Sequence, residues 1–77
     1  MKPNEAAEIL GLNIGEMSAL LGIHRETYGK WHRGNQRPPA VAIGAIELWI
    51  ELKKRFPRQF RRLADERIGV RKNENRF

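Results

Sequence analysis

The 77-residue sequence predicts an all-α protein in which four to five helices form one compact domain at residues 1–68, followed by a flexible basic tail at residues 69–77. Apolar side chains recur every three or four residues, which is the spacing of one buried helical face. Glycine and proline interrupt this pattern at intervals typical of short helices. The chain is long enough for one small core, and it has no cysteine that could form a disulfide or a thiolate zinc site.

The first helix is expected to begin at Pro3 and to run to about Leu10. Proline suits the first turn of a helix, and Glu5 lies near the positive end of the helix dipole. Gly11 follows as a residue that readily adopts a left-handed helix cap. We expect the buried face of this helix to consist of Ala6, Ile9 and Leu10.

Residues 13–34 predict two short helices joined at Gly22. Asn13 is an expected N-cap, and Glu16 stands three residues later, as a capping box requires. The second helix of the pair should begin near His24 and end at Gly34. The inward positions are predicted to be Met17, Leu20, Leu21, Ile23, Tyr28 and Trp31. The outward positions of the second helix are then Arg25, Glu26, Gly29, Lys30 and Arg33.

Two longer segments complete the expected fold. A loop with two prolines precedes a helix that starts at about Pro39. Its apolar stripe is broad, which suggests that one edge is left for a partner subunit; it comprises Ala42, Ile43, Ala45, Ile46, Trp49, Ile50 and Leu52. Pro57 should end or kink that helix after Phe56. A fifth helix is expected to follow, with its inward residues at Phe60, Leu63 and Ala64.

Six cations lie between residues 53 and 62, and the sequence allows two interpretations of them. These are Lys53, Lys54, Arg55, Arg58, Arg61 and Arg62. A cationic run is usually a solvated face. The same run could instead contribute additional contacts to phosphate groups. The sequence favours neither interpretation.

The charge distribution indicates a polyanionic partner. The formal net charge is +6 and the isoelectric point is about 10.5. Residues 1–24 contain one lysine and three glutamates, so the basic excess lies entirely in residues 25–77. DNA, RNA or an acidic membrane would satisfy the charge alone.

Several functional classes are disfavoured by the sequence. His24 and His32 lack the further ligands of a metal site, so we expect no metal and no cofactor. No nucleophile with an acid–base relay and no glycine-rich phosphate loop is recognisable, so we expect no enzymatic activity. The longest apolar stretch is too short to cross a bilayer, and no secretory signal is recognisable. We therefore expect a soluble, cytoplasmic protein.

A near-repeat leaves a second frame for the helix pair. The segment EAAEILGLN at residues 5–13 is similar to EMSALLGIH at residues 16–24. In this rival frame, residues 14–21 would form the outward-facing helix and Gly11 would mark the turn. That helix carries Glu16 and no cation, whereas residues 25–33 carry Arg25, Lys30 and Arg33. Attraction to phosphate therefore favours the frame centred on Gly22.

Residues 4–55 resemble the Cro/CI-type, or XRE-like, helix-turn-helix family. The matching features are the turn glycine Gly22 followed by Ile23, Arg25 and Thr27 early in the next helix, and the ending Lys30-Trp31-His32-Arg33-Gly34. The two prolines soon after this ending and the single long helix that follows are especially similar to small phage or mobile-element autorepressors, including anti-CRISPR-associated repressors.

The sequence departs from the family pattern at three positions. Ile14 stands where the family often has a glutamine that contacts phosphate, and it cannot form that hydrogen bond. Ser18 replaces the usual alanine, and its hydroxyl could bond back to the preceding turn. His32 stands where glutamate is common. These changes leave the architecture intact and put the phosphate contacts of the first helix of the pair in doubt.

The resemblance implies a DNA-contacting role for six residues. The base-reading positions fall on Arg25, Glu26 and Lys30, whose side chains can pair with guanine or, for the carboxylate, with cytosine N4. Glu26 could equally form an ion pair with Lys30, four residues later. Gly29 could serve close packing or could let the helix sit deeper in the groove. The expected phosphate anchors are Arg33, Asn35 and Arg37.

The sequence therefore predicts a sequence-specific transcriptional regulator, most simply a dimeric repressor that binds double-stranded DNA at an inverted repeat in a phage or mobile-element promoter. The expected dimer interface comprises Trp49, Phe56, Phe60 and Leu63. The alternative is a protein-interaction module, such as an antitoxin or adaptor, whose basic segment docks an acidic partner. RNA binding is disfavoured because no exposed aromatic pair is apparent.

Overall fold

A computed structural model describes the backbone of residues 2–74 and the side chains of residues 2–69. The chain forms five α-helices: α1 (Pro3–Leu10), α2 (Ile14–Leu21), α3 (Arg25–His32), α4 (Ala40–Arg55) and α5 (Pro57–Glu74). Residues 2–74 contain no strand. The Cα radius of gyration is 12.0 Å, close to the value of about 11.5 Å expected for a compact domain of this length. The all-α prediction is confirmed.

The ends of α1 and α2 are set by local signals that the sequence predicted. Asn13 Oδ1 accepts a hydrogen bond from the Glu16 backbone N–H at 2.8 Å, and Glu16 Oε1 accepts one from the Asn13 N–H at 3.0 Å. Gly11 and Gly22 cap the two helices with φ values of 69° and 73°. A side chain with a Cβ is disfavoured in this left-handed region, so glycine fixes both ends.

Proline separates the last two helices. Helix α4 ends at Arg55, Phe56 is its C-cap, and Pro57 is the first residue of α5. Proline has no N–H and preorganises φ, so it breaks the preceding helix and suits the start of the next. The position of this break was predicted correctly.

The predicted boundary at residue 68 is not a structural one. Helix α5 continues through Gly69 to Glu74, where we expected a flexible tail beginning at residue 69. Once a helix is formed, each further residue adds a backbone hydrogen bond, so a single glycine need not end it. Residues 75–77 of the expected tail lie outside the described residues.

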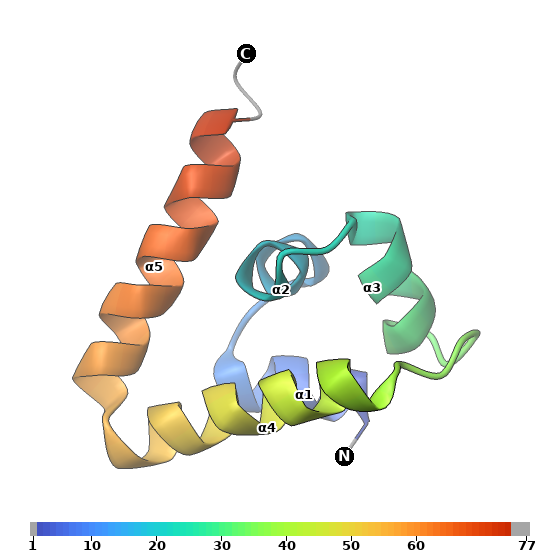
Figure 1. The fold of residues 1–77 in the computed structure, drawn as a ribbon, viewed down its shortest axis with the longest axis horizontal. Helices are drawn as coiled ribbons and strands as arrows, with labels where there is room; N and C mark the ends of the chain where they lie inside the picture. Colours follow the sequence, from blue (N-terminus) through green and yellow to red (C-terminus); the bar gives the residue numbers. More distant parts are fainter. Residues whose placement is uncertain (1, 75–77) are drawn as a thin grey trace.

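Helix α2 lies at the centre of the arrangement. Figure 1 shows it nearly end-on, between α5 and α3 and above α1 and α4, which run side by side. Helix α5 packs against α2 and α4, and its C-terminal turns extend past the other helices. No helix in the described part of the chain is long and apolar enough to span a bilayer.

One core joins all five helices. Its buried members are Ala6, Ala7, Leu10, Met17, Leu20, Tyr28, Trp31, Ile46, Ile50, Phe60 and Ala64. Two residues that we expected inside are instead 40% exposed, namely Ile9 and Leu63. The core sides of α1 and α5 are occupied by Ala6, Leu10, Phe60 and Ala64, so Ile9 and Leu63 lie at the margin of each stripe.

Candidate nucleic-acid interface

Helix α3 has one buried side and one exposed, charged side. Tyr28 is fully buried and Trp31 is 6% exposed, and their rings meet edge to face with centroids 6.2 Å apart. Arg25, Glu26 and Lys30 are exposed. Together with His24 and Thr27, these three residues line a hollow of about 440 Å³. The exposed side of α3 therefore carries a concave surface as well as charged side chains.

The turn before α3 is held by backbone hydrogen bonds. The Ile23 N–H donates to the Ser18 carbonyl at 3.0 Å, and the Gly22 N–H donates to the Ala19 carbonyl at 3.3 Å. Gly22 is in the left-handed conformation that this turn requires. The turn therefore fixes the angle at which α3 leaves α2.

Ser18 is buried where the resembled family usually has alanine. Its hydroxyl donates to the Gly15 carbonyl at 2.7 Å, within the same helix. A buried hydroxyl without a partner would be destabilising, and this hydrogen bond removes that cost. The expected back-bonding of Ser18 is confirmed.

Tyr28 ties α3 to the start of α1. Its hydroxyl donates to the Pro3 carbonyl at 2.7 Å, and both groups are buried. Burial raises the pKa of Tyr28 from 10.0 to about 12, because the phenolate would lose its solvation. The buried aromatic ring serves packing, as the sequence indicated, and it is not available to stack on a base.

The charged groups of α3 are not paired with each other. Among the residues that the structure describes, one ion pair occurs, between Arg55 and Glu51. Neither Glu26 nor Lys30 forms an ion pair with a described residue. The alternative of a Glu26–Lys30 pair is therefore not realised in this structure. Both side chains remain available for an external partner.

Gly29, which we expected to face outward, is buried beneath the side chain of Arg33, the C-cap of α3. A Cβ built at this position would lie 3.1 Å from Arg33 Nη1, so the Arg33 guanidinium lies across the space that a side chain would fill. Of the two interpretations of Gly29, this contact favours close packing. The neighbour is the end of a flexible side chain, so the constraint on residue 29 is mild.

The predicted phosphate anchors lie in the loop that follows α3. Arg33, Asn35 and Arg37 are all exposed. The backbone N–H groups of Asn35 and Gln36 donate to the Lys30 carbonyl, at 2.9 and 3.3 Å. These two hydrogen bonds fold the loop back against the end of α3 at Lys30.

The two frames for the helix pair can be compared by exposure. Helix α2 has no fully exposed residue, and Met17, Ser18, Ala19 and Leu20 are all buried. Base edges in a groove are reached by outward-pointing side chains. The geometry therefore disfavours α2 as a base-reading helix and favours α3 for that role.

Two cations serve the fold in a way that the sequence analysis missed. Lys53 Nζ donates to the Ile9 carbonyl at 2.6 Å, and Arg67 Nε donates to the Leu20 carbonyl at 2.7 Å. Each therefore binds a carbonyl in the last turn of a helix, where a positive charge is favoured. The partners are 44 and 47 residues apart, and no local pattern could have paired them.

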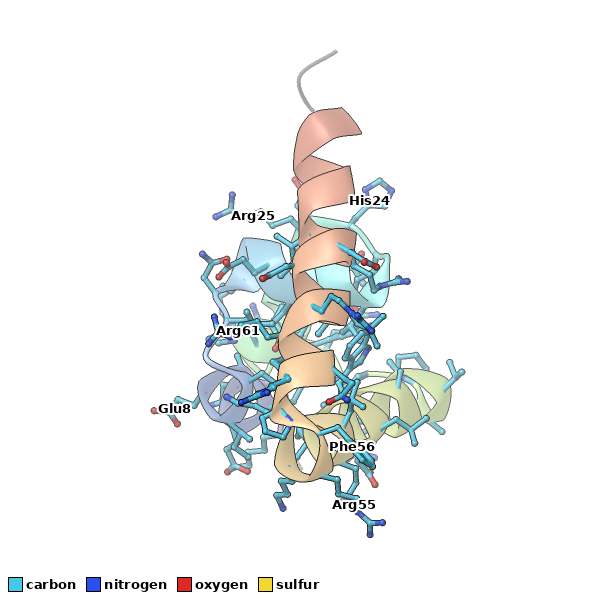
Figure 2. All side chains as sticks on the ribbon, turned by 90° about the vertical axis from the view of Figure 1, so that its left-hand side faces the viewer. Glu8, His24, Arg25, Arg55, Phe56 and Arg61 are labelled. Carbon is cyan, nitrogen blue, oxygen red and sulfur yellow. The ribbon has the colours of Figure 1, made fainter. Side chains whose placement is uncertain are left out.

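The rest of the cationic run is directed to solvent. Arg55 pairs with Glu51 at 3.0 Å, and Lys54, Arg58, Arg61 and Arg62 are exposed. In Figure 2 the side chains of Arg61 and Arg25 project to the same side of the molecule, as does that of Glu8, whereas His24 projects to the other side. For the other four cations, both interpretations of the run stay open, namely a solvated face or additional phosphate contacts. Lys53 and Arg55 are excepted, because each binds another residue of the protein.

The predicted dimer interface is only partly exposed. Phe60 is 7% exposed and packs edge to face on Trp49, with centroids 6.0 Å apart, so Phe60 belongs to the core and the prediction for it was wrong. Trp49 is half-buried against the same core. Phe56 and Leu63 are exposed, and Figure 2 shows Phe56 at the corner between α4 and α5.

Two further apolar side chains on α4 are exposed and were not singled out from the sequence. Val41 is 81% exposed and Leu48 is 73% exposed. They are seven residues apart, so they lie two turns apart on one side of the helix. The breadth of the apolar stripe of α4 could have predicted this exposure, since one helix cannot bury its whole circumference against a single small core.

Residues that could hold a metal do not cluster. No group of three or more His, Cys, Asp or Glu side chains with the geometry of a metal site occurs among the residues that the structure describes.

No known protein family, curated protein or solved structure matches this chain. The site is therefore interpreted from its own residues.

Proposed function

We propose that this protein is a DNA-binding transcriptional regulator of the Cro/CI-like kind, with α3 as the helix that enters the major groove. The observation that carries the proposal is the two-sided character of α3. Tyr28 and Trp31 anchor it in the core, and Arg25, Glu26 and Lys30 are exposed on its other side, where none of them forms an ion pair with a described residue. A helix that docks in a groove needs a fixed back and a polar front.

Each exposed side chain of α3 has a chemistry suited to base edges. Arg25 can donate two hydrogen bonds to O6 and N7 of guanine, and Lys30 can donate to the same edge. Glu26 can accept from N4 of cytosine. Arg33, Asn35 and Arg37 would bind backbone phosphates and fix the register of α3 along the groove.

In this proposal the protein acts in the cytoplasm as a homodimer on an inverted repeat, and it represses a phage or mobile-element promoter. Two-fold symmetry would place one α3 in each of two successive major grooves, about 34 Å apart. The small core favours association, because a domain of this size is only marginally stable alone. No catalytic role and no cofactor form part of the proposal.

The test is a gel shift with DNA from upstream of the protein's own gene, at about physiological salt. We expect a discrete complex for the wild type. Arg25→Ala should weaken specific binding by about 1–3 kcal/mol and relax one base position. Arg55→Ala is a matched control, because it removes an exposed arginine at the end of α4 whose ion-pair partner is Glu51. Equal binding of operator and scrambled DNA by the wild type would contradict the proposal.

Arg37→Ala separates phosphate contacts from base contacts. This change should weaken binding to all sequences alike and should reduce the slope of log K against log salt by about 1. Arg25→Ala should instead affect the operator more than scrambled DNA. An unchanged salt slope for Arg37→Ala would remove Arg37 from the phosphate contacts.

The alternative function, a protein-interaction module such as an antitoxin or adaptor, is favoured by one observation. Val41, Leu48 and Phe56 are exposed apolar residues on or next to α4, and such residues are common where proteins associate. Under this alternative, DNA would give only smeared bands that disappear as salt rises.

A further inference from the structure

A basic hollow lies between the beginning of α1 and the end of α3. Its volume is about 400 Å³, and its walls are formed by residues 2–4 on one side and by residues 31–34 and 36–38 on the other. Three cations line it, Lys2, Arg33 and Arg37, and no acidic residue is among the residues that line it. An anion would therefore be attracted to this hollow without opposition from a neighbouring carboxylate.

The walls of the hollow are held rigidly together. The buried hydrogen bond from the Tyr28 hydroxyl to the Pro3 carbonyl joins the two sides. The rings of Trp31 and His32 both pack against Tyr28, with centroid distances of 6.2 and 6.0 Å. A site whose walls are fixed before binding loses little conformational freedom when a ligand enters.

One buried hydrogen-bond donor in this region, the Trp31 indole N–H, has no acceptor among the described residues. Trp31 lines the hollow and is 6% exposed, and its indole Nε1 is buried without a hydrogen-bond partner. The indole nitrogen can only donate, and buried donors are nearly always paired in native proteins. His32 Nδ1 is likewise buried without a partner among the described residues, and no side chain caps the N-terminus of α1. Asn4 and Gln36 line the same hollow, and neither of their side-chain oxygens accepts a hydrogen bond from the Trp31 indole.

We propose that this hollow binds a phosphate group, with Lys2, Arg33 and Arg37 supplying charge and the Trp31 indole N–H donating to one oxygen. The phosphate can come from a DNA backbone or from free phosphate. The DNA form rests on the proposed function and extends its phosphate contacts from the loop to Lys2 and Trp31. Helix α3 is about 12 Å long, close to the width of the major groove, so its C-terminal end would approach a strand backbone.

The indole N–H signals in a ¹H–¹⁵N correlation spectrum test the site directly. The chain has two tryptophans, and Trp49 packs on Phe60 in α5, so its signal is an internal control. Inorganic phosphate is added at constant ionic strength, with chloride as the reference anion. We expect the Trp31 signal to shift in a saturable manner and the Trp49 signal to stay in place. A duplex containing the upstream DNA should move the same Trp31 signal.

Two variants and one control locate the phosphate. Lys2→Gln should weaken the phosphate-induced shift of Trp31 severalfold and should reduce the salt slope of duplex binding by about 1. Trp31→Phe should abolish the indole signal that shifts and weaken phosphate binding, detected by ³¹P line broadening. Arg55→Gln removes an exposed cation from the end of α4 that is paired with Glu51, and it should change neither quantity.

The outcomes separate this proposal from the proposed function. A Trp31 signal that moves with neither phosphate nor duplex overturns the phosphate site. An unchanged phosphate response in Lys2→Gln likewise overturns the assignment of Lys2. If phosphate shifts Trp31 but no duplex is retarded in a gel, the site stands in its free-phosphate form and the DNA-binding function fails.

Discussion

The Tyr28 hydroxyl is held at the centre of the domain by burial and by one hydrogen bond. Among the described residues it donates to the Pro3 carbonyl, which belongs to the opposite end of the three-helix segment α1–α3. The two residues are 25 apart in sequence, so this buried hydrogen bond links the beginning of α1 directly to α3. This residue couples the start of the chain to the helix that we propose reads DNA.

The raised pKa of Tyr28 should be measurable in a pH titration of the folded protein. Tyr28 is the only tyrosine, so the ultraviolet absorbance of tyrosinate reports it alone. The folded protein should titrate with a midpoint at about 12, and the denatured protein near 10.0. Between these values the folded state binds more protons than the unfolded state, so stability should fall as pH rises through this window. A folded-state midpoint near 10.0 would contradict the burial of the hydroxyl.

At the residue scale, the buried and exposed sides of α3 could be predicted from the sequence because they differ in amino-acid composition. Aromatic residues at helical spacing indicated the buried side, and the cations between them indicated the exposed side. The hollow at Lys2 and Trp31 was not predicted, since it depends on the approach of α1 to the end of α3. No spacing in the sequence encodes that approach.

At the scale of elements, the helix ends were predicted well because their causes are local. The Asn13–Glu16 capping box and the left-handed glycines Gly11 and Gly22 act within three residues of the end that they fix. The length of α5 was underestimated, because a helix can continue without a periodic apolar face when its preceding turns are already anchored. The caps from Lys53 and Arg67 depend on tertiary contacts and were not predictable.

At this scale, replacing each of two glycines by alanine should change the free energy of unfolding in opposite directions. Gly22→Ala should lower the free energy of unfolding by about 1–2 kcal/mol, because φ at this turn is +73°. Gly44→Ala should raise it by about 1 kcal/mol, because Gly44 lies inside α4 with nothing within 4 Å of an added Cβ. Urea unfolding of both variants measures the two effects. If both changes had the same sign, backbone conformation would not govern the turn.

At the scale of the whole molecule, the core that joins the five helices leaves five large apolar side chains exposed among the described residues. Ile9 lies on α1, Val41 and Leu48 lie on α4, Phe56 lies between α4 and α5, and Leu63 lies on α5. Phe56 and Leu63 are the two residues of the predicted dimer interface that remain exposed. Phe60 could not be separated from Leu63 by sequence alone, because both fit the apolar stripe of α5.

Sedimentation equilibrium of two matched variants distinguishes the predicted interface from the exposed side chains of α4. Leu63→Glu places a charge on the predicted interface and should shift the protein from dimer to monomer, because a buried unpaired carboxylate is costly. Leu48→Glu makes the same change on α4 and should leave the dimer intact. Both side chains are exposed, so neither change should disrupt the fold. Dissociation by Leu48→Glu alone would move the interface to α4.

The account depends most on the claim that the exposed side of α3 lies in the major groove. Methylation protection of guanine N7 in the DNA upstream of the gene measures that contact directly, because N7 lies on the major-groove edge. We expect protected guanines in two patches about 10 base pairs apart, with one guanine in each patch losing protection in Arg25→Ala. Binding that leaves every guanine N7 reactive, or a protection pattern unchanged by Arg25→Ala, would contradict the account.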